Sequence, residues 1–195
     1  MSHYFSNDND TLKSNPTEIA FSVNGISLKL TTDNGVFSKS DLDRGTRVLL
    51  ETIELEENKT ALDLGCGYGP VGIYLNQKFK VKSDMVDINE RALNLSRINV
   101  DKYSIKNEVF FSDGFTNITK KYDYIITNPP IRTGKENVYK LLTDAKDHLL
   151  PSGALYVVIN KKHGAESAIK KLNELYHQVV VLNRKKGFYV IECKI

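Results

Sequence analysis

The 195-residue sequence has no long apolar run and only two cysteines. A membrane-spanning helix needs ~18 or more consecutive apolar residues, and no stretch comes near that length. The first ten residues are polar and lack the apolar segment of a secretion signal, so we expect a cytoplasmic protein with no membrane partner. Cys66 and Cys193 lie far apart, and neither has His or Cys neighbours at metal-ligand spacing. The sequence therefore predicts two packed thiols, with neither a disulfide nor a metal site.

The length and composition are those of a single folded unit. Domains usually contain ~100 to 200 residues, which leaves room here for one domain and a short extension. The chain is 41% hydrophobic and 26% charged, a balance that is typical of globular proteins and excludes a disordered or fibrous chain. We expect this unit to be monomeric.

Basic residues are concentrated in the last third of the chain. Residues 1–127 carry 15 basic and 18 acidic side chains, whereas residues 128–195 carry 12 and 6. A basic surface of this kind attracts phosphate groups, although paired lysines also occur on ordinary solvated faces. The candidate contacts to a nucleic acid are Arg132, Lys135, Lys161, Lys162, Lys185 and Lys186.

The N-terminal part is predicted to form a hairpin and a helix. Asn24-Gly25 separates two apolar runs and is the dipeptide that tolerates the two positive φ angles of a type I′ turn. Farther on, apolar residues recur at helical spacing, with Ser40 or Asp41 placed to cap the helix. We therefore expect, in order, a poorly structured tail, two paired strands and a helix: residues 1–18, 19–23, 26–30 and 42–53.

From residue 60 onward, strand and helix patterns alternate. The predicted strands are 60–65, 81–86, 107–111, 122–127 and 154–159, and the predicted helices are 70–79, 89–103, 136–150 and 164–176. Parallel strands need such crossover helices, so the pattern predicts an α/β fold with a mostly parallel sheet that helices cover on both faces. Residues 178–182 and 188–191 leave no room for a helix between them. They should close a seven-stranded sheet as an antiparallel hairpin that turns at Gly187.

A glycine-rich loop follows the first strand of this pattern. Residues 61–70 read ALDLGCGYGP, in which three alternating glycines let the backbone pass close to a ligand. A dinucleotide-binding fingerprint that begins at Gly65 requires Gly or Ala where Pro70 stands, so the loop does not fit a nicotinamide or flavin enzyme. Asp63 and the following GxGxG instead resemble motif I of enzymes that use S-adenosylmethionine (SAM).

Two further carboxylates follow predicted strands. Asp87 stands 22 residues after Gly65, where doubly wound folds place an acceptor for ribose hydroxyls, unless it caps the next helix. Asp113 has the position from which SAM enzymes bind the adenine amino group, or it is a plain turn residue. Because ligands bind beyond the carboxyl ends of the strands, these residues should line one crevice. The predicted cofactor contacts are Asp63, Gly65, Cys66, Gly67, Tyr68, Gly69, Asp87, Ile88, Asp113, Gly114, Phe115 and Asn128.

The fourth strand is followed by Asn128-Pro129-Pro130-Ile131, which resembles the (N/D)PP(Y/F) motif of methyltransferases that modify planar amino groups. Such an amine is a poor nucleophile because its lone pair is delocalised. Acceptors aimed at its hydrogens favour the pyramidal form that attacks. We expect the Asn128 amide oxygen and the Pro129 carbonyl to be those acceptors, held rigid by Pro130. The role needs an acceptor, so Asn should serve as well as Asp.

The fourth position of this motif departs from the pattern. It is Ile131, where related enzymes have the aromatic residue on which a flipped base stacks. Stacking must then come from elsewhere or be replaced by aliphatic contact. Phe37, Phe115 and Phe188 are the aromatic candidates, and each can equally belong to the core.

The chain resembles, from end to end, the small-subunit (16S) rRNA guanine-N2 methyltransferase C family in a single-domain form. The matching segments are 3–6, 34–38, 43–46, the motif I glycines, 128–132 and 161–165. The resemblance implies a class I methyltransferase fold, with residues 59–195 as the SAM-dependent domain and residues 1–58 packed on it. It also implies methyl transfer to the N2 amine of a guanine, with ribosomal RNA or the small ribosomal subunit as the partner.

Other functions stay open. A protein glutamine methyltransferase would use the same Asn-Pro-Pro motif in the same way, because a side-chain amide is also a planar, weak nucleophile. It usually has Tyr in place of Ile131 and a helical N-terminal domain. A non-catalytic SAM-fold module would bind RNA without turnover, although intact Asp63, Asp87 and Asn128 argue against it. A small-molecule methyltransferase is less favoured, since no extra lid is apparent.

Overall fold

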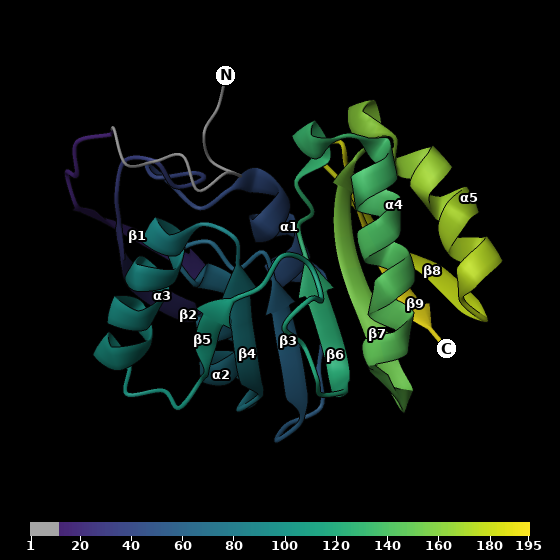
Figure 1. Cartoon of the computed structure of the whole chain (residues 1–195), viewed down its shortest axis with the longest axis horizontal. Helices are drawn as coiled ribbons and strands as arrows, with labels where there is room; N and C mark the ends of the chain where they lie inside the picture. Colours follow the sequence, from purple (N-terminus) through teal and green to yellow (C-terminus); the bar gives the residue numbers. More distant parts are fainter. Residues whose placement is uncertain (1–11) are drawn as a thin grey trace.

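The computed structural model describes residues 12–195, apart from the side chain of Arg132, and this part of the chain contains two sheets. The larger sheet has seven strands in the order β5-β4-β3-β6-β7-β9-β8 (Figure 1). They are β3 Thr60–Leu64, β4 Lys82–Asp87, β5 Val109–Phe111, β6 Tyr122–Thr127, β7 Leu149–Asn160, β8 Gln178–Lys185 and β9 Phe188–Lys194. Strands β3 to β7 run parallel, and β9 is antiparallel to both β7 and β8. The predicted fold class is confirmed.

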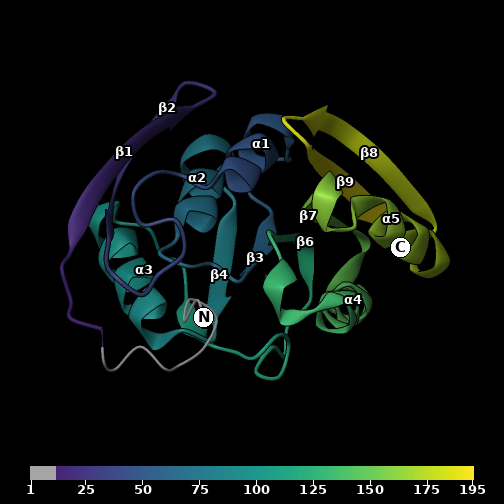
Figure 2. The ribbon, with the colours of Figure 1, turned by 90° about the horizontal axis from the view of Figure 1, so that it is seen from above.

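Helices cover both faces of this sheet. One group is α1 Arg44–Thr52, α2 Pro70–Phe79 and α3 Glu90–Lys102, and the other is α4 Lys135–Asp144 and α5 Ala165–Leu175. Neighbouring residues of a strand point to opposite faces, so Ala61 packs in the core of the first group and Leu62 in that of the second. Figure 2 shows the two groups on opposite sides of the sheet.

The smaller sheet is the predicted N-terminal hairpin. Strands β1 Thr17–Val23 and β2 Ile26–Thr32 pair in antiparallel fashion, and they lie outside α2 and α3 (Figure 2). Asn24 and Gly25 form the turn with φ of 45° and 80°, as a type I′ turn requires. The hairpin is thereby confirmed, although β1 begins inside the predicted tail. The first eleven residues of that tail lie outside the described part.

A buried side chain of α3, Asn99, ties this hairpin to the glycine-rich loop. Its Oδ1 accepts from the Thr31 N–H at 2.7 Å, and its Nδ2 donates to the carbonyls of Thr31 (2.9 Å) and Tyr68 (2.8 Å). Ser96, one turn earlier, donates to the Gly67 carbonyl at 3.0 Å. Helix α3 therefore holds both the hairpin and the loop that follows β3.

The start of the first helix differs from the prediction. Helix α1 begins after Asp43, and Asp43 is its cap, so the assignment of Ser40 or Asp41 is wrong. The backbone of Asp43 is extended, and its carboxylate accepts from the Thr46 N–H at 2.8 Å, as an N-cap does. The cap lies where the first free helical N–H groups lie, and helical spacing of apolar residues does not locate that point.

The helix predicted for residues 136–150 is too long. Helix α4 ends at Asp144, a 3-10 turn follows over Ala145–His148, and β7 begins at Leu149. The residue before a proline avoids helical backbone angles, and Pro151 therefore favours the extended conformation just before it. The leucines counted as helical belong to the strand.

The cysteines and the helices agree with a compact α/β core. Cys66 and Cys193 are free and buried, as predicted. Among residues 12–195, no helix is long and apolar enough to cross a membrane. Over the same residues, no cluster of three or more His, Cys, Asp or Glu side chains has the arrangement of a metal site.

Candidate active site

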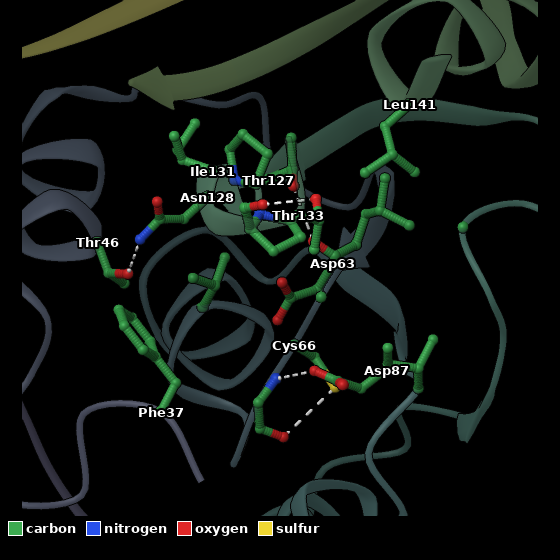
Figure 3. A pocket seen from close by; sticks show the side chains of 18 of the residues that line it. Phe37, Thr46, Asp63, Cys66, Asp87, Thr127, Asn128, Ile131, Thr133 and Leu141 are labelled. Carbon is green, nitrogen blue, oxygen red and sulfur yellow. Dashed lines mark hydrogen bonds between the residues drawn. The ribbon is translucent and has the colours of Figure 1, made fainter. Parts of the chain in front are cut away.

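A cleft of about 1140 Å³ opens at the carboxyl ends of the parallel strands (Figure 3). The loops after β3, β4, β5 and β6 line it, and the segment before α1 closes one side. Ligands of open α/β sheets bind at this edge. The predicted cofactor contacts that line the cleft are Asp63, Gly65, Cys66, Gly67, Tyr68, Asp87, Ile88, Asp113, Gly114, Phe115 and Asn128.

The loop after β3 presents its backbone to the cleft. Gly65 and Gly67 have φ of 78° and 57°, and an added Cβ at either would meet no protein atom within 4 Å. A side chain there would extend into the cleft itself. The loop is fixed from behind, because the Gly65 N–H donates to the Val86 carbonyl and the Gly67 N–H to Asp87 Oδ2, both at 2.9 Å. The result is a preformed surface for a ligand that approaches the backbone closely.

Gly69 differs from the other two glycines. It does not line the cleft, and an added Cβ would lie 2.9 Å from both Met85 Cε and Ser96 Oγ. The absence of a side chain at Gly69 thus serves the packing of the loop on β4 and α3. Gly69 is thus the one predicted cofactor contact that is not part of the cleft lining.

Asp63 lies beneath the loop. Its side chain is 2% exposed, and Oδ2 accepts from the Gly72 N–H at 2.9 Å, which fixes the start of α2 against β3. Burial raises the pKa of the Asp63 carboxyl to about 7, and the Asp87 carboxylate acts in the same direction, whereas the bond from Gly72 opposes it. A carboxyl that titrates near neutrality therefore borders the cleft.

Asp87 holds the loop and does not cap the next helix. Its Oδ2 accepts from Gly67 and its Oδ1 accepts from the Asn89 N–H at 2.9 Å. The cap of α3 is Asn89, whose side chain accepts from the backbone of Arg91 and Ala92. Desolvation raises the pKa of Asp87, and these backbone N–H groups oppose the shift. Asp87 lines the cleft, and its contact with a ribose hydroxyl stays a prediction.

The turn after β5 forms another wall. Asp113 is exposed and lines the cleft. The buried Ser112 holds the turn by donating to the Gly114 carbonyl at 2.8 Å. The ring of Phe115 stacks on His148, with centroids 4.7 Å apart and 13° between the planes. Phe115 is thus packed against a protein ring, and His148 is a cleft residue that no sequence motif indicates.

The Asn-Pro-Pro segment lies at the end of β6. The Thr127 hydroxyl donates to the Leu64 carbonyl at 2.9 Å, which joins the ends of β6 and β3. The Asn128 Nδ2 donates to Asp43 Oδ2 at 2.8 Å and to Thr46 Oγ1 at 3.1 Å, as the contact with Thr46 in Figure 3 shows. Among the described residues, both hydrogen bonds of the Asn128 side chain are therefore made by its nitrogen, and its oxygen is left to accept.

The aromatic candidates for base stacking occupy different surroundings. Phe37 lines the cleft and is 41% exposed. Phe188 also borders the cleft, but its ring is packed against Gly45, whose added Cβ would lie 2.9 Å from Phe188 Cε1. Phe115 is 9% exposed and stacked on His148. Phe37 and the half-buried Ile131 both line the cleft.

Four of the predicted basic contacts lie beside the cleft and outside its lining. We call Lys161, Lys162, Lys185 and Lys186 the basic rim. The Lys161 N–H donates to the Gly187 carbonyl at 2.7 Å, which joins the turn after β7 to the turn between β8 and β9. Asn160, His163 and Phe188, next to these lysines in the chain, line the cleft.

The other two basic candidates are Lys135 and Arg132. Lys135 starts α4 and lies 5.2 Å from the centre of the Tyr139 ring, outside the cleft lining. The side chain of Arg132 is outside the described atoms.

Asp43 and Thr46 are site residues that the sequence did not assign. They belong to the segment Asp43-Arg44-Gly45-Thr46, which shares the family resemblance but suggests no role of its own. The local signal is an N-cap and its partner three residues on, which predicts where a helix begins. It does not predict a contact with a residue 85 positions later.

A seven-stranded sheet in this order, with a glycine-rich loop after its first parallel strand and an acidic residue after the second, defines a class I methyltransferase. The family model described as "Methyltransferase small domain" matches residues 27–192. The chain therefore belongs to the methyltransferase small domain family. Its cofactor is SAM, as predicted, and the open cradle at Gly65 and Gly67 fits such a ligand.

Two curated relatives illustrate the range of matches. YbxB of Bacillus subtilis, an uncharacterized protein, is 41% identical over 199 residues, which cover 100% of this chain and 99% of YbxB. The ribosomal RNA small subunit methyltransferase C of Pasteurella multocida is 39% identical over 138 residues, which cover 68% of this chain and 42% of that protein. The match therefore spans less than half of the Pasteurella protein.

Solved structures show the same fold. A T. thermophilus 16S rRNA N2 methyltransferase (RsmC), in complex with AdoMet and guanosine, matches with a TM-score of 0.85 and 22% identity. The match covers 94% of this chain and 51% of that chain. The predicted resemblance to the small-subunit rRNA methyltransferase C family is confirmed.

The glycine loop yields a test with a matched control. Gly65→Ala should lower SAM affinity by about tenfold or more, because a methyl group that overfills a fitted site costs about 1–3 kcal/mol. Gly25→Ala is the control, since Gly25 has nearly the same φ (80° against 78°) and an equally open Cβ position, but lies in the hairpin turn. Calorimetry should show normal affinity for the control. If both variants lost SAM affinity equally, or if neither lost any, the glycine-rich loop would not be the SAM site.

The raised pKa of Asp63 makes stability depend on pH. An acid whose pKa is about 7 when folded and near 4 when unfolded holds its proton longer in the native state, so its contribution to stability is lost as pH rises from about 4 to 7. Asp63→Asn removes this titration. The free energy of unfolding of the variant, relative to the natural protein, should therefore rise by about 2 kcal/mol between pH 5 and pH 8 in urea titrations. If the free energies of unfolding of the variant and of the natural protein changed in parallel with pH, the raised pKa of Asp63 would be refuted.

Proposed function

We propose that this methyltransferase transfers a methyl group from SAM to the exocyclic N2 amine of a guanine in 16S ribosomal RNA. The proposal rests above all on the Asn128 amide, which lines the same cleft as the glycine-rich loop. Its nitrogen donates to Asp43 and Thr46, and within residues 12–195, the Arg132 side chain aside, no donor is bonded to its oxygen. A fixed acceptor close to the methyl donor is what a planar amine needs for its attack.

The residues of the Asn-Pro-Pro segment divide this task. SAM, when bound, supplies a methyl group on a positively charged sulfur. The Asn128 oxygen and the Pro129 carbonyl accept from the two hydrogens of the amine and so localise its lone pair on nitrogen. The Pro130 carbonyl accepts from the Thr133 N–H at 3.0 Å, which holds the segment at the cleft edge. The site acts by positioning and by preorganised dipoles.

Phe37 and Ile131 are proposed to hold the guanine. Figure 3 shows them on either side of the Asn128 amide in that view. A base that leaves its stack loses a few kcal/mol, and an exposed aromatic ring replaces part of that contact. Phe37 would supply this stacking, since it lines the cleft and is 41% exposed.

The basic rim is proposed to bind RNA phosphates near the cleft. Lys185 pairs with Glu51 at 2.7 Å and Lys161 with Glu166 at 3.7 Å. The side chains of these two lysines are 47% and 60% exposed, and exposed ion pairs contribute about 0–1 kcal/mol, so phosphates can replace the carboxylates.

The relatives support this choice of substrate. The Pasteurella protein is a ribosomal RNA methyltransferase by name, and the T. thermophilus structure contains guanosine together with AdoMet. A glutamine side-chain amide would present a similar planar nitrogen to Asn128. A glutamine-containing peptide is therefore the second substrate to assay.

The function is tested by single-turnover methylation with labelled SAM. Small ribosomal subunits and naked 16S rRNA from a deletion strain are the substrates, and nucleoside mass spectrometry identifies the product. We expect N2-methylguanosine from the natural chain. Asn128→Ala should lower kcat by about 10²-fold, with SAM affinity nearly unchanged, because one preorganised polar group is lost. Methylation of the peptide and not of the RNA, or an Ala variant within a few-fold of the natural chain, would overturn the proposal.

The basic rim is tested by its salt dependence. Lys→Gln at all four rim positions should weaken RNA binding and flatten the log-log salt slope by roughly 0.7 to 0.9 for each phosphate that the variant no longer neutralises. The control carries Lys→Gln at Lys80, Lys82, Lys106 and Lys121, near the starts of β4, β5 and β6 and thus at the opposite edge of the sheet. Both variants lose the same charge. Equal slopes in the two variants would show that the rim is an ordinary solvated face.

A further inference from the structure

The hydrogen bonds of Asn128 reach the start of α1, far away in the sequence. Its Nδ2 donates to Asp43 Oδ2 at 2.8 Å and to Thr46 Oγ1 at 3.1 Å. A carboxylate accepts hydrogen bonds and has none to donate, so Asp43 can face the nitrogen of the amide and not its oxygen. The two ends of the Asn128 amide are thereby distinguished by their surroundings.

The Asp43 carboxylate is itself fixed. The same Oδ2 accepts from the Thr46 N–H at 2.8 Å, and the N-terminus of α1 favours the negative charge. Gly45 makes room for it, because an added Cβ there would lie 3.1 Å from this oxygen and 2.9 Å from Phe188 Cε1. The position of the carboxylate is therefore set by the helix and by the packing of β9, independently of Asn128.

This fixed carboxylate matters because an Asn amide is nearly symmetric in shape but not in chemistry. A half-turn about its last bond would present NH₂ to the cleft in place of the oxygen. A donor would then face the hydrogens of the substrate amine, and Asn128 could not accept them. A carboxylate that disfavours the turned orientation of the Asn128 amide therefore raises the rate of methyl transfer.

We infer that Asp43 is a positioning residue, which orients the Asn128 amide so that its oxygen faces the reacting amine. This inference rests on the proposed function and adds that positions 43 and 128 form a matched pair of one carboxylate and one amide. A carboxylate at position 128 would face that of Asp43 across a contact that is now 2.8 Å, and like charges at this distance disfavour joint ionisation. Asn and Asp are thus not interchangeable at position 128 of this chain, in contrast to the expectation from the motif.

The test is whether Asp43→Ser changes kcat in opposite directions in the natural chain and in the Asn128→Asp variant. Asp43→Ser keeps an oxygen that caps α1, but its shorter side chain does not reach Asn128. In the natural chain it should lower kcat by about tenfold or more, because the amide loses its orientation. Asn128→Asp alone should lower kcat by about 10²-fold. In that background, Asp43→Ser should raise kcat by about tenfold or more, since both oxygens of a carboxylate accept and the repulsion is gone.

A structural role for Asp43 would not give this reversal, because a loss of helix capping lowers activity in both backgrounds. SAM affinity and thermal unfolding should stay near those of the natural chain in all variants. Asp41→Ser is the matched control: the Asp41 carboxylate accepts from the Leu42 N–H at 2.7 Å and lies outside the cleft lining. Asp41→Ser should therefore leave kcat unchanged. A fall in kcat on Asp43→Ser in both backgrounds, or in neither, would overturn the inference.

The orientation is also measurable without a substrate. The side-chain NH₂ protons of Asn128 give a pair of signals in a two-dimensional NMR spectrum. Asp43→Ser should shift these signals and speed their exchange with water, whereas Asp41→Ser should leave them in place. Unmoved signals in Asp43→Ser would overturn the pairing whatever the substrate is. Absence of RNA methylation by the natural chain, with the signals shifted as expected, would instead overturn the proposed function alone.

Discussion

The carbonyls of Gly67 and Tyr68 accept hydrogen bonds from Ser96 and Asn99, and the cleft depends on the loop that these bonds hold. A loop that offers bare backbone to a ligand has no side chains on that face to stabilise it. Its support comes from α3 and from the Asp87 carboxylate, which satisfy its polar groups. Breaking one such buried bond leaves an unpaired group that costs about 1–3 kcal/mol, so the loop has little freedom to collapse into the cleft.

The order of helices and strands could be predicted because it depends on residues that are close in the chain. The spacing of apolar side chains, the Asn24-Gly25 turn and the placement of Gly187 between two strands are all local properties, and the structure confirms each of them. The errors occur where two local preferences compete. Leu149 fits a helical spacing, yet the following backbone is extended before Pro151.

The site was predictable in outline and less so in its contacts. The glycines and the acidic residues after strands indicate a ligand edge, since this edge is common to open parallel sheets. The role of each residue depends on what lies opposite. Gly65 and Gly69 look alike in the sequence, but one faces open space and the other faces Met85. The bond between Asp43 and Asn128 joins the start of a helix to the end of a strand, and no local pattern encodes it.

The two N–H groups of Asn99 have a consequence for motion. One donates to Thr31 of the hairpin and the other to Tyr68 of the glycine loop, so a fluctuation that swings the hairpin off α3 removes contacts that hold the Asn99 side chain in place and thereby weakens its support of the loop. A ligand that binds the closed loop and not the opened state raises the free energy of that opening by mass action. The N-terminal hairpin, although it takes no part in the main sheet, is thus linked energetically to cofactor occupancy, and slower hydrogen exchange of its backbone amides would report a filled site.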